Sequence, residues 1–172
     1  MLTFEKKLPA QVKELHTMLR DVCAEPSWKW LSQALHSIED ASFSQSANAA
    51  AINKTCSALL ITSAAAKREL GSSPVVIYGQ SPTWHSHDIG RLLLLQQFKH
   101  CLFRLQQEQW SHSLLKVYRR FGEDEKALLL RSLSLLGGAE LLPIALDASR
   151  TNDEALYATL ALNNPYPGTH FP

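Results

Sequence analysis

The stretch from Arg91 to Phe121 contains neither glycine nor proline, and this absence constrains the fold more than any other feature of the sequence. Its composition favours a helix. One helix over the whole stretch would be about 46 Å long at 1.5 Å per residue, whereas a compact chain of this length has a radius of gyration of about 16 Å. We therefore expect two helices, with a break between Gln106 and Ser111.

The first 70 residues carry apolar side chains at helical spacing. Residues 8–22 repeat them every three or four positions, which predicts a first helix with Pro9 in its opening turn. Pro26 opens a second helix with one apolar face. An alanine-rich run predicts a third helix over about residues 47–70, which Gly71 ends.

Residues 71–83 form the clearest break in the helical pattern. Glycine, serine and proline bracket a short apolar run from Val75 to Tyr78. A lone strand would have no partner here, so we expect an extended loop that places Val76 or Ile77 in the core.

Three more helices are predicted in the last 50 residues. They cover about residues 123–136, 143–149 and 152–163. Thr151 or Asn152 is expected to cap the last one. Pro165 restricts the residue before it, so that helix should end at Asn164. Residues 164–172 then form an extended, proline-rich tail that must be held by the surface on which it lies.

The fold class predicted is all-α, a compact stack of about eight short antiparallel helices. Tight turns between helices suggest hairpins like those of HEAT or armadillo repeats. We expect one domain over residues 1–172. Its parts are N-terminal helices (1–70), a loop (71–83), a stack of helical hairpins (84–163) and the extended tail (164–172).

Composition excludes several classes of function. Hydrophobic residues make up 45% of the chain, and the formal net charge is +1, which gives no electrostatic footprint for nucleic acid. No apolar run approaches the roughly 20 residues of a membrane span. We expect a cytoplasmic protein with no cofactor, because neither a secretory signal nor a phosphate-binding or catalytic motif is present. The three cysteines lack metal spacing.

Two groups of polar residues are candidate sites. Asp88 and Arg91 lie three residues apart at a helix start, close to Trp84, which is expected in the core or along a groove. The arginine could bind an anionic ligand, or the two could form a local ion pair. His85 and His87 suggest a metal, but residues two apart do not converge on a helix, and we expect no metal site.

The second group lies around the last helix. Arg150 and Asn152 precede this helix, and Asn163, Asn164 and Tyr166 follow it, so the two ends are about 15 Å apart. Arg150 could donate to carbonyls freed near the Asn-Pro turn. The alternative is a polar pocket beneath that turn.

Two motifs carry a resemblance to a known family. The C-terminal run combines Ala148–Asn152, Leu162–Pro167 and His170–Pro172. In the second motif, Asp88 follows Trp84 by four residues, and Arg91 opens a run of leucines. Together they resemble the EboA family. The resemblance implies a bacterial protein of a secondary-metabolite or precursor-export gene cluster, encoded beside prenyltransferase-like and hydrolase-like enzymes.

Three functional hypotheses follow. The first is a non-catalytic adaptor or scaffold that binds a partner enzyme of the cluster, or a small metabolite in transit, in a groove of the stack. The second is an enzyme or carrier of a new type that acts on an anionic prenyl- or cyclitol-like metabolite. The third is a regulatory or structural role without a ligand. The candidate binding residues are Trp84, Asp88, Arg91, Arg150, Asn152, Asn163 and Tyr166.

Overall fold

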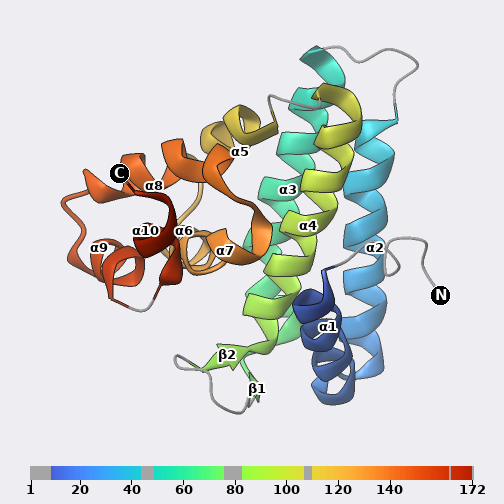
Figure 1. Cartoon of the computed structure of the whole chain (residues 1–172). Coiled ribbons are helices and arrows are strands. Elements are labelled where there is room, and N and C mark those ends of the chain that lie inside the picture. The colour runs from blue at the N-terminus through green and yellow to red at the C-terminus, as the bar shows by residue number, and fades with distance from the viewer. Residues whose placement is uncertain (1–8, 44–48, 76–82, 107–109, 163, 172) are drawn as a thin grey trace.

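The computed structural model describes residues 9–43, 49–75, 83–106, 110–162 and 164–171, and it confirms the all-α class (Figure 1). In the first half of the chain the elements are α1 (Ala10–Val22), α2 (Glu25–Ser42), α3 (Ala49–Leu70), β1 (Pro74–Val75) and β2 (Trp84–His85). In the second half they are α4 (Ser86–Gln106), α5 (Trp110–Tyr118), α6 (Glu123–Arg131), α7 (Leu133–Leu136), η2 (Ala139–Leu141), α8 (Leu142–Ser149), α9 (Glu154–Ala161) and α10 (Pro165–His170).

Helix α4 is the centre of the molecule. It packs against α1, α2 and α3 on one side and against α5, α6 and α7 on the other. Four consecutive leucines, residues 92–95, are each at most 2% exposed, so apolar side chains leave the helix in every direction. A helix that is apolar all round is stable only when neighbours cover all of it. The buried run of leucines after Arg91 therefore marks α4 as a core helix.

Helices α2, α3 and α4 run side by side along most of their length (Figure 1). Gly71 ends α3 in the left-handed region at φ 70°, where glycine has no steric penalty. Gly90 of α4 lies against Leu70 at the end of α3, since a β-carbon there would fall 2.0 Å from Leu70 Cδ1. These helices have 18, 22 and 21 residues, and the long third helix predicted over about residues 47–70 is α3.

The expectation that the segment after α3 has no strand partner is wrong. Strand β1 pairs antiparallel with β2, with Val75 opposite Trp84. The ladder brings the start of α4 back to the end of α3, where Ser86 Oγ donates to the free carbonyls of Leu70 and Gly71 at 2.9 Å each. The predicted core residues Val76 and Ile77 lie outside the described residues, whereas Val75 is buried.

The short helices α5 to α10 gather on the far side of α4 from α2 (Figure 1). The break predicted between Gln106 and Ser111 is confirmed, because α4 ends at Gln106 and α5 begins at Trp110. The helix predicted over residues 123–136 divides at Ser132, whose Oγ donates to the Leu128 carbonyl at 2.8 Å. The likeness of this group to HEAT or armadillo hairpins stays a prediction.

The prediction of an extended tail is wrong, because Pro165–His170 forms α10. Asn164 does adopt the extended conformation that a following proline imposes, but it begins a helix instead of ending one: its Oδ1 accepts the Tyr166 N–H at 3.0 Å. The preceding helix α9 ends earlier, at Ala161. Its N-cap is Asp153, not Thr151 or Asn152. Proline also suits the first turn of a helix, and Pro165 occupies that position in α10.

Candidate functional site

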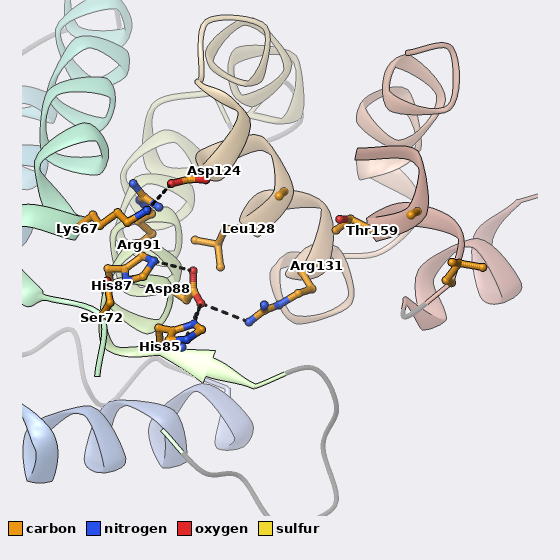
Figure 2. Close-up of a pocket in the computed structure, with 13 residues that line it drawn as sticks. Lys67, Ser72, His85, His87, Asp88, Arg91, Asp124, Leu128, Arg131 and Thr159 are labelled. Atoms are coloured by element: carbon orange, nitrogen blue, oxygen red, sulfur yellow. Dashed lines mark hydrogen bonds and ion pairs between the residues drawn. The ribbon is translucent and has the colours of Figure 1, made fainter. Parts of the chain in front are cut away.

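A cavity of about 540 Å³ lies where the long helices α3 and α4 face the short helices α6 and α9 (Figure 2). The end of α3, strand β2 and the start of α4 form one wall, and α6 and α9 form the other. The lining comprises Lys67, Ser72, His85, His87, Asp88, Arg91, Asp124, Ala127, Leu128, Arg131, Ala158, Thr159 and Leu162. The volume is within the range of about 300–1,000 Å³ that small-molecule sites occupy.

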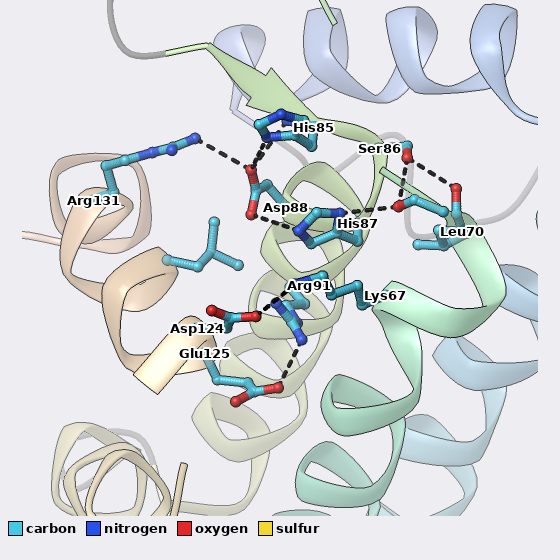
Figure 3. A network of polar contacts seen from close by, with 12 residues as sticks. Lys67, Leu70, His85, Ser86, His87, Asp88, Arg91, Asp124, Glu125 and Arg131 are labelled. Atoms are coloured by element: carbon cyan, nitrogen blue, oxygen red, sulfur yellow. Dashed lines mark hydrogen bonds and ion pairs between the residues drawn. The ribbon is translucent and has the colours of Figure 1, made fainter. Parts of the chain in front are cut away.

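Asp88 is held by the first turn of α4 (Figure 3). Its Oδ2 accepts the backbone N–H of His85 at 3.0 Å, which is the backward half of a capping box. His85 Nδ1 lies 3.3 Å from the same oxygen, and His87 Nε2 lies 3.5 Å from Oδ1. The hydrogen bond to the His85 N–H thus holds the carboxylate through Oδ2, and the His87 ring, whose Nδ1 donates to the Gly71 carbonyl at 2.9 Å, lies beside Oδ1.

Arg131, the last residue of α6, extends across the cavity toward Asp88 (Figure 2). Its guanidinium lies 4.2 Å from the centroid of the Trp84 ring, a cation–π contact. Nη2 is 3.7 Å from Asp88 Oδ2, an ion pair too long for a hydrogen bond. Nε and Nη2 are buried and have no hydrogen-bond partner among the described residues. Burial lowers the pKa of the Arg131 guanidinium, and Asp88 offsets part of that effect.

Arg91 joins three helices in the floor of the cavity. Its Nε donates to the Ser63 carbonyl of α3 at 3.0 Å, and Nη2 donates to Glu125 Oε1 of α6 at 2.7 Å. The side chain is only 3% exposed, and Nη1 is left without a partner in the described part of the chain. The sequence allows a local ion pair between Asp88 and Arg91 as one of two alternatives for this group. This alternative is wrong, because Arg91 pairs with Glu125 and Asp88 pairs with Arg131.

Lys67 and Asp124 form an exposed pair at the edge of the cavity. Lys67 Nζ lies 3.0 Å from Asp124 Oδ2, and both side chains are more than half exposed. The hydrogen bond from Lys67 lowers the pKa of the Asp124 carboxyl, with smaller contributions from nearby cations. Solvent screens such a pair, which contributes at most about 1 kcal/mol to stability.

The opposite wall of the cavity carries both polar and apolar side chains. Its polar members are Asp124 and Arg131 of α6 and Thr159 of α9. Its apolar members, here called the apolar patch, are Ala127, Leu128, Ala158 and Leu162, and Leu162 is 76% exposed. The cavity thus combines ionisable side chains from both walls with an apolar patch on the α6–α9 wall.

The structure brings together only some of the candidate binding residues. Asp88 and Arg91 line the cavity, and Trp84 lies beneath Arg131. Arg150 and Asn152 are exposed and do not line it. Tyr166 is buried elsewhere, against Gly138, and Asn163 lies outside the described residues.

The side chain of Arg150 makes no hydrogen bond or ion pair within the described part of the chain, although its backbone N–H donates to the Asp147 carbonyl at 3.3 Å. The donation to carbonyls near the Asn-Pro turn does not occur among those residues. Instead, Asn164 Nδ2 donates to the Leu130 carbonyl at 2.7 Å.

Sequence reasoning missed Lys67, Asp124, Glu125 and Arg131. Each meets its cavity partner across more than 30 residues of chain, and no spacing rule predicts such contacts. It also misjudged His85 and His87. A strand ends between them, so both reach Asp88, and their rings stack with centroids 5.6 Å apart. Within the described ranges, no three His, Cys, Asp or Glu side chains are placed to hold a metal ion.

This arrangement, a helical protein with a polar-walled cavity, agrees with what the sequence comparisons find. The family model described as metabolite traffic protein EboA matches residues 11–172, so the chain belongs to the EboA family. No curated protein and no solved structure matches the chain. Among the helices in the described ranges, none is long and apolar enough to cross a membrane.

Proposed function

We propose that this protein binds a small metabolite in the cavity between β2–α4 and α6–α9 and hands it on without transforming it. The observation that carries the proposal is the set of buried arginine N–H groups around the cavity, on Arg91 and Arg131, that lack acceptors. A buried donor without an acceptor costs about 1–3 kcal/mol, and more when the group is charged. A ligand that supplies acceptors there recovers this free energy on binding.

The family description supports traffic of a metabolite over its chemical conversion. The carboxylates of the cavity are already engaged by protein groups. Asp88 Oδ2 accepts the His85 N–H, and Asp124 Oδ2 accepts from Lys67. These hydrogen bonds favour the ionised carboxylates over their protonated forms and occupy one oxygen of each, which supports binding over proton transfer.

A second candidate function is docking of an enzyme from the same gene cluster. It is favoured by two apolar side chains exposed on or next to α9, Tyr157 (52%) and Leu162 (76%), the second of which also lines the cavity. A partner bound there would stand where the metabolite leaves. Binding of purified cluster-encoded prenyltransferase-like and hydrolase-like enzymes, lost in Leu162→Glu, would support this function, whereas equal binding by the variant would reject it.

Small-molecule retention tests the metabolite-binding function. The protein is incubated with a metabolite extract of its source cells, desalted and denatured, and the released compounds are identified by mass spectrometry. We expect one compound at close to equimolar amount from the wild type and little from Ala158→Phe, which fills the cavity from α9.

The matched control is Ala161→Phe, an exposed position of the same helix that does not line the cavity. It should retain the compound. Equal retention by the two variants, or no compound from the wild type, would reject the function.

A further inference from the structure

The α6–α9 wall of the cavity combines the cation of Arg131 with the apolar patch, and this combination defines a class of ligand. We propose that the ligand is an amphipathic anion, whose carboxylate or phosphate lies against Arg131 and whose apolar body lies along Leu128, Ala158 and Leu162. This inference rests on the proposed metabolite-binding function and narrows it to one class.

Arg131 is the cation of the cavity that lacks a hydrogen-bonded counterion. Lys67 is hydrogen-bonded to Asp124, and Arg91 to Glu125. Arg131 has only the 3.7 Å ion pair with Asp88, whose oxygens already accept from the His85 N–H and face two imidazole rings. Two of its nitrogens, Nε and Nη2, consequently keep hydrogens with no acceptor within the described residues.

The orientation of Arg131 suits an oxyanion. A guanidinium presents Nε and Nη2 in one plane, and this edge binds the two oxygens of a carboxylate or phosphate in parallel. The contact with the Trp84 ring holds that plane in place before any ligand arrives. Little side-chain entropy is therefore lost on binding. A neutral acceptor would satisfy the same hydrogens, whereas an anion would also add to the partial compensation that Asp88 gives the buried charge from 3.7 Å away.

The apolar patch favours a ligand whose remaining part is apolar. Leu128 and Ala158 border the cavity, and Leu162, which also lines it, is 76% exposed. Covering apolar area stabilises a complex by about 25 cal/mol per Å². A small hydrophilic anion such as glycerol phosphate would reach Arg131 and leave the apolar patch exposed to water.

Calorimetric titration with a matched set of probes tests the class. The probes are octyl phosphate, octanoate, octanol, octylammonium and glycerol 3-phosphate, each below its micelle concentration. We expect octyl phosphate or octanoate, or both, to bind at least about tenfold more tightly than octanol and glycerol phosphate, because a hydrogen bond to a charged group contributes about 1.5–3 kcal/mol. Octylammonium should not bind. The ratio of octyl phosphate to octanoate affinity identifies the acidic group.

Two variants assign the effect to Arg131. Arg131→Met should remove the preference for the anions over octanol, and Arg131→Lys, which keeps the charge but loses the planar fork, should keep part of it. Arg150→Met is the matched control, since Arg150 is exposed, lies outside the cavity and carries the same charge. It should bind like the wild type.

The experiments distinguish a wrong ligand class from the absence of metabolite binding. Equal binding of octanol and octyl phosphate, tight binding of glycerol phosphate, or no binding of either octyl anion would overturn the amphipathic anion, even if the extract yields a retained compound. An absence of any retained compound would overturn metabolite binding itself. If Arg131→Met does not fold, the wild-type affinities for octanol and octyl phosphate decide.

Discussion

Tyr166 fixes the position of the last helix through a single side chain. Its ring is fully buried and stacks on His170 with centroids 4.3 Å apart, and its hydroxyl donates to the Gly138 carbonyl at 2.6 Å. Burial raises the pKa of Tyr166 to about 12, from 10.0. The free energy of unfolding therefore includes a contribution that is complete below pH 10 and is lost as the pH rises toward 12.

Tyr166→Phe removes the hydroxyl and leaves the Gly138 carbonyl without its donor. We expect a loss of about 1–2 kcal/mol in the free energy of unfolding at pH 7, and a smaller loss of stability than the wild type shows between pH 10 and pH 11. Urea denaturation at pH 7, 10 and 11 measures both.

Tyr118→Phe is the control at pH 7, because Tyr118 is also buried but its hydroxyl makes no hydrogen bond within the described ranges. An equal loss in the two variants would mean that the Gly138 contact contributes nothing.

At the scale of single elements, the glycine in α4 shows how closely the long helices pack. A β-carbon at Gly90 would overlap Cδ1 of Leu70, a side chain that is 5% exposed and would have to change its rotamer within the core to make room. Gly168 in α10 has no neighbour within 4 Å of such a carbon. Replacing glycine by alanine in a helix otherwise stabilises it by about 1 kcal/mol.

Gly90→Ala should therefore lower the free energy of unfolding, because overpacking costs about 1–3 kcal/mol and exceeds the gain in helix propensity. Gly168→Ala should raise it slightly. Thermal melts of both variants measure the effect. A stabilised Gly90→Ala would show that α3 and α4 separate without cost, and restoration of stability in Gly90→Ala combined with Leu70→Ala would assign the loss to this contact.

Helices could be predicted from sequence wherever the signal is local. Gly71 ends α3, the stretch after Arg91 breaks near Trp110, and Pro143 opens α8, because these effects act within one or two turns. The tail was mispredicted because Pro165 fits both the residue after a helix and the first turn of the next. Only burial of Tyr166 in the folded protein selects the second. Strand β1 was missed because its partner β2 is only two residues long.

At the scale of the whole molecule, Arg91 and Glu125 tie the long helices to the short ones. The pair spans α4 and α6, and Arg91 also holds α3 through the Ser63 carbonyl. Both side chains are largely buried, at 3% and 13% exposure. Removing one partner of such a pair leaves a buried charge uncompensated, which costs about 3–5 kcal/mol.

Glu125→Leu should therefore destabilise the protein by about 3–5 kcal/mol, and Arg91→Met combined with Glu125→Leu should recover most of that loss. A double-mutant cycle in urea isolates the coupling. Arg119→Met, which breaks the exposed pair with Asp147, should cost less than about 1 kcal/mol. Similar losses for the Glu125 and Arg119 variants would contradict a buried tie between the two halves.

The candidate site could be predicted only on one wall. Trp84, Asp88 and Arg91 lie within two turns of one another, so sequence spacing places them together. The other wall, with Arg131 and Leu162, comes from helices that meet α4 only in the folded molecule. Arg150 was included for its neighbourhood in sequence, yet it lies on an exposed surface away from the cavity.

A crystal structure of the protein with the tighter-binding octyl anion in brominated form, 8-bromooctyl phosphate or 8-bromooctanoate, tests the metabolite site most directly, since the bromine marks the apolar end by anomalous scattering. The expected result is a bromine peak beside Ala158 and Leu162, with the acidic group within hydrogen-bond distance of Arg131 Nε and Nη2. An empty cavity at saturating ligand, or bromine bound only elsewhere on the molecule, would contradict the assignment of this cavity as the binding site.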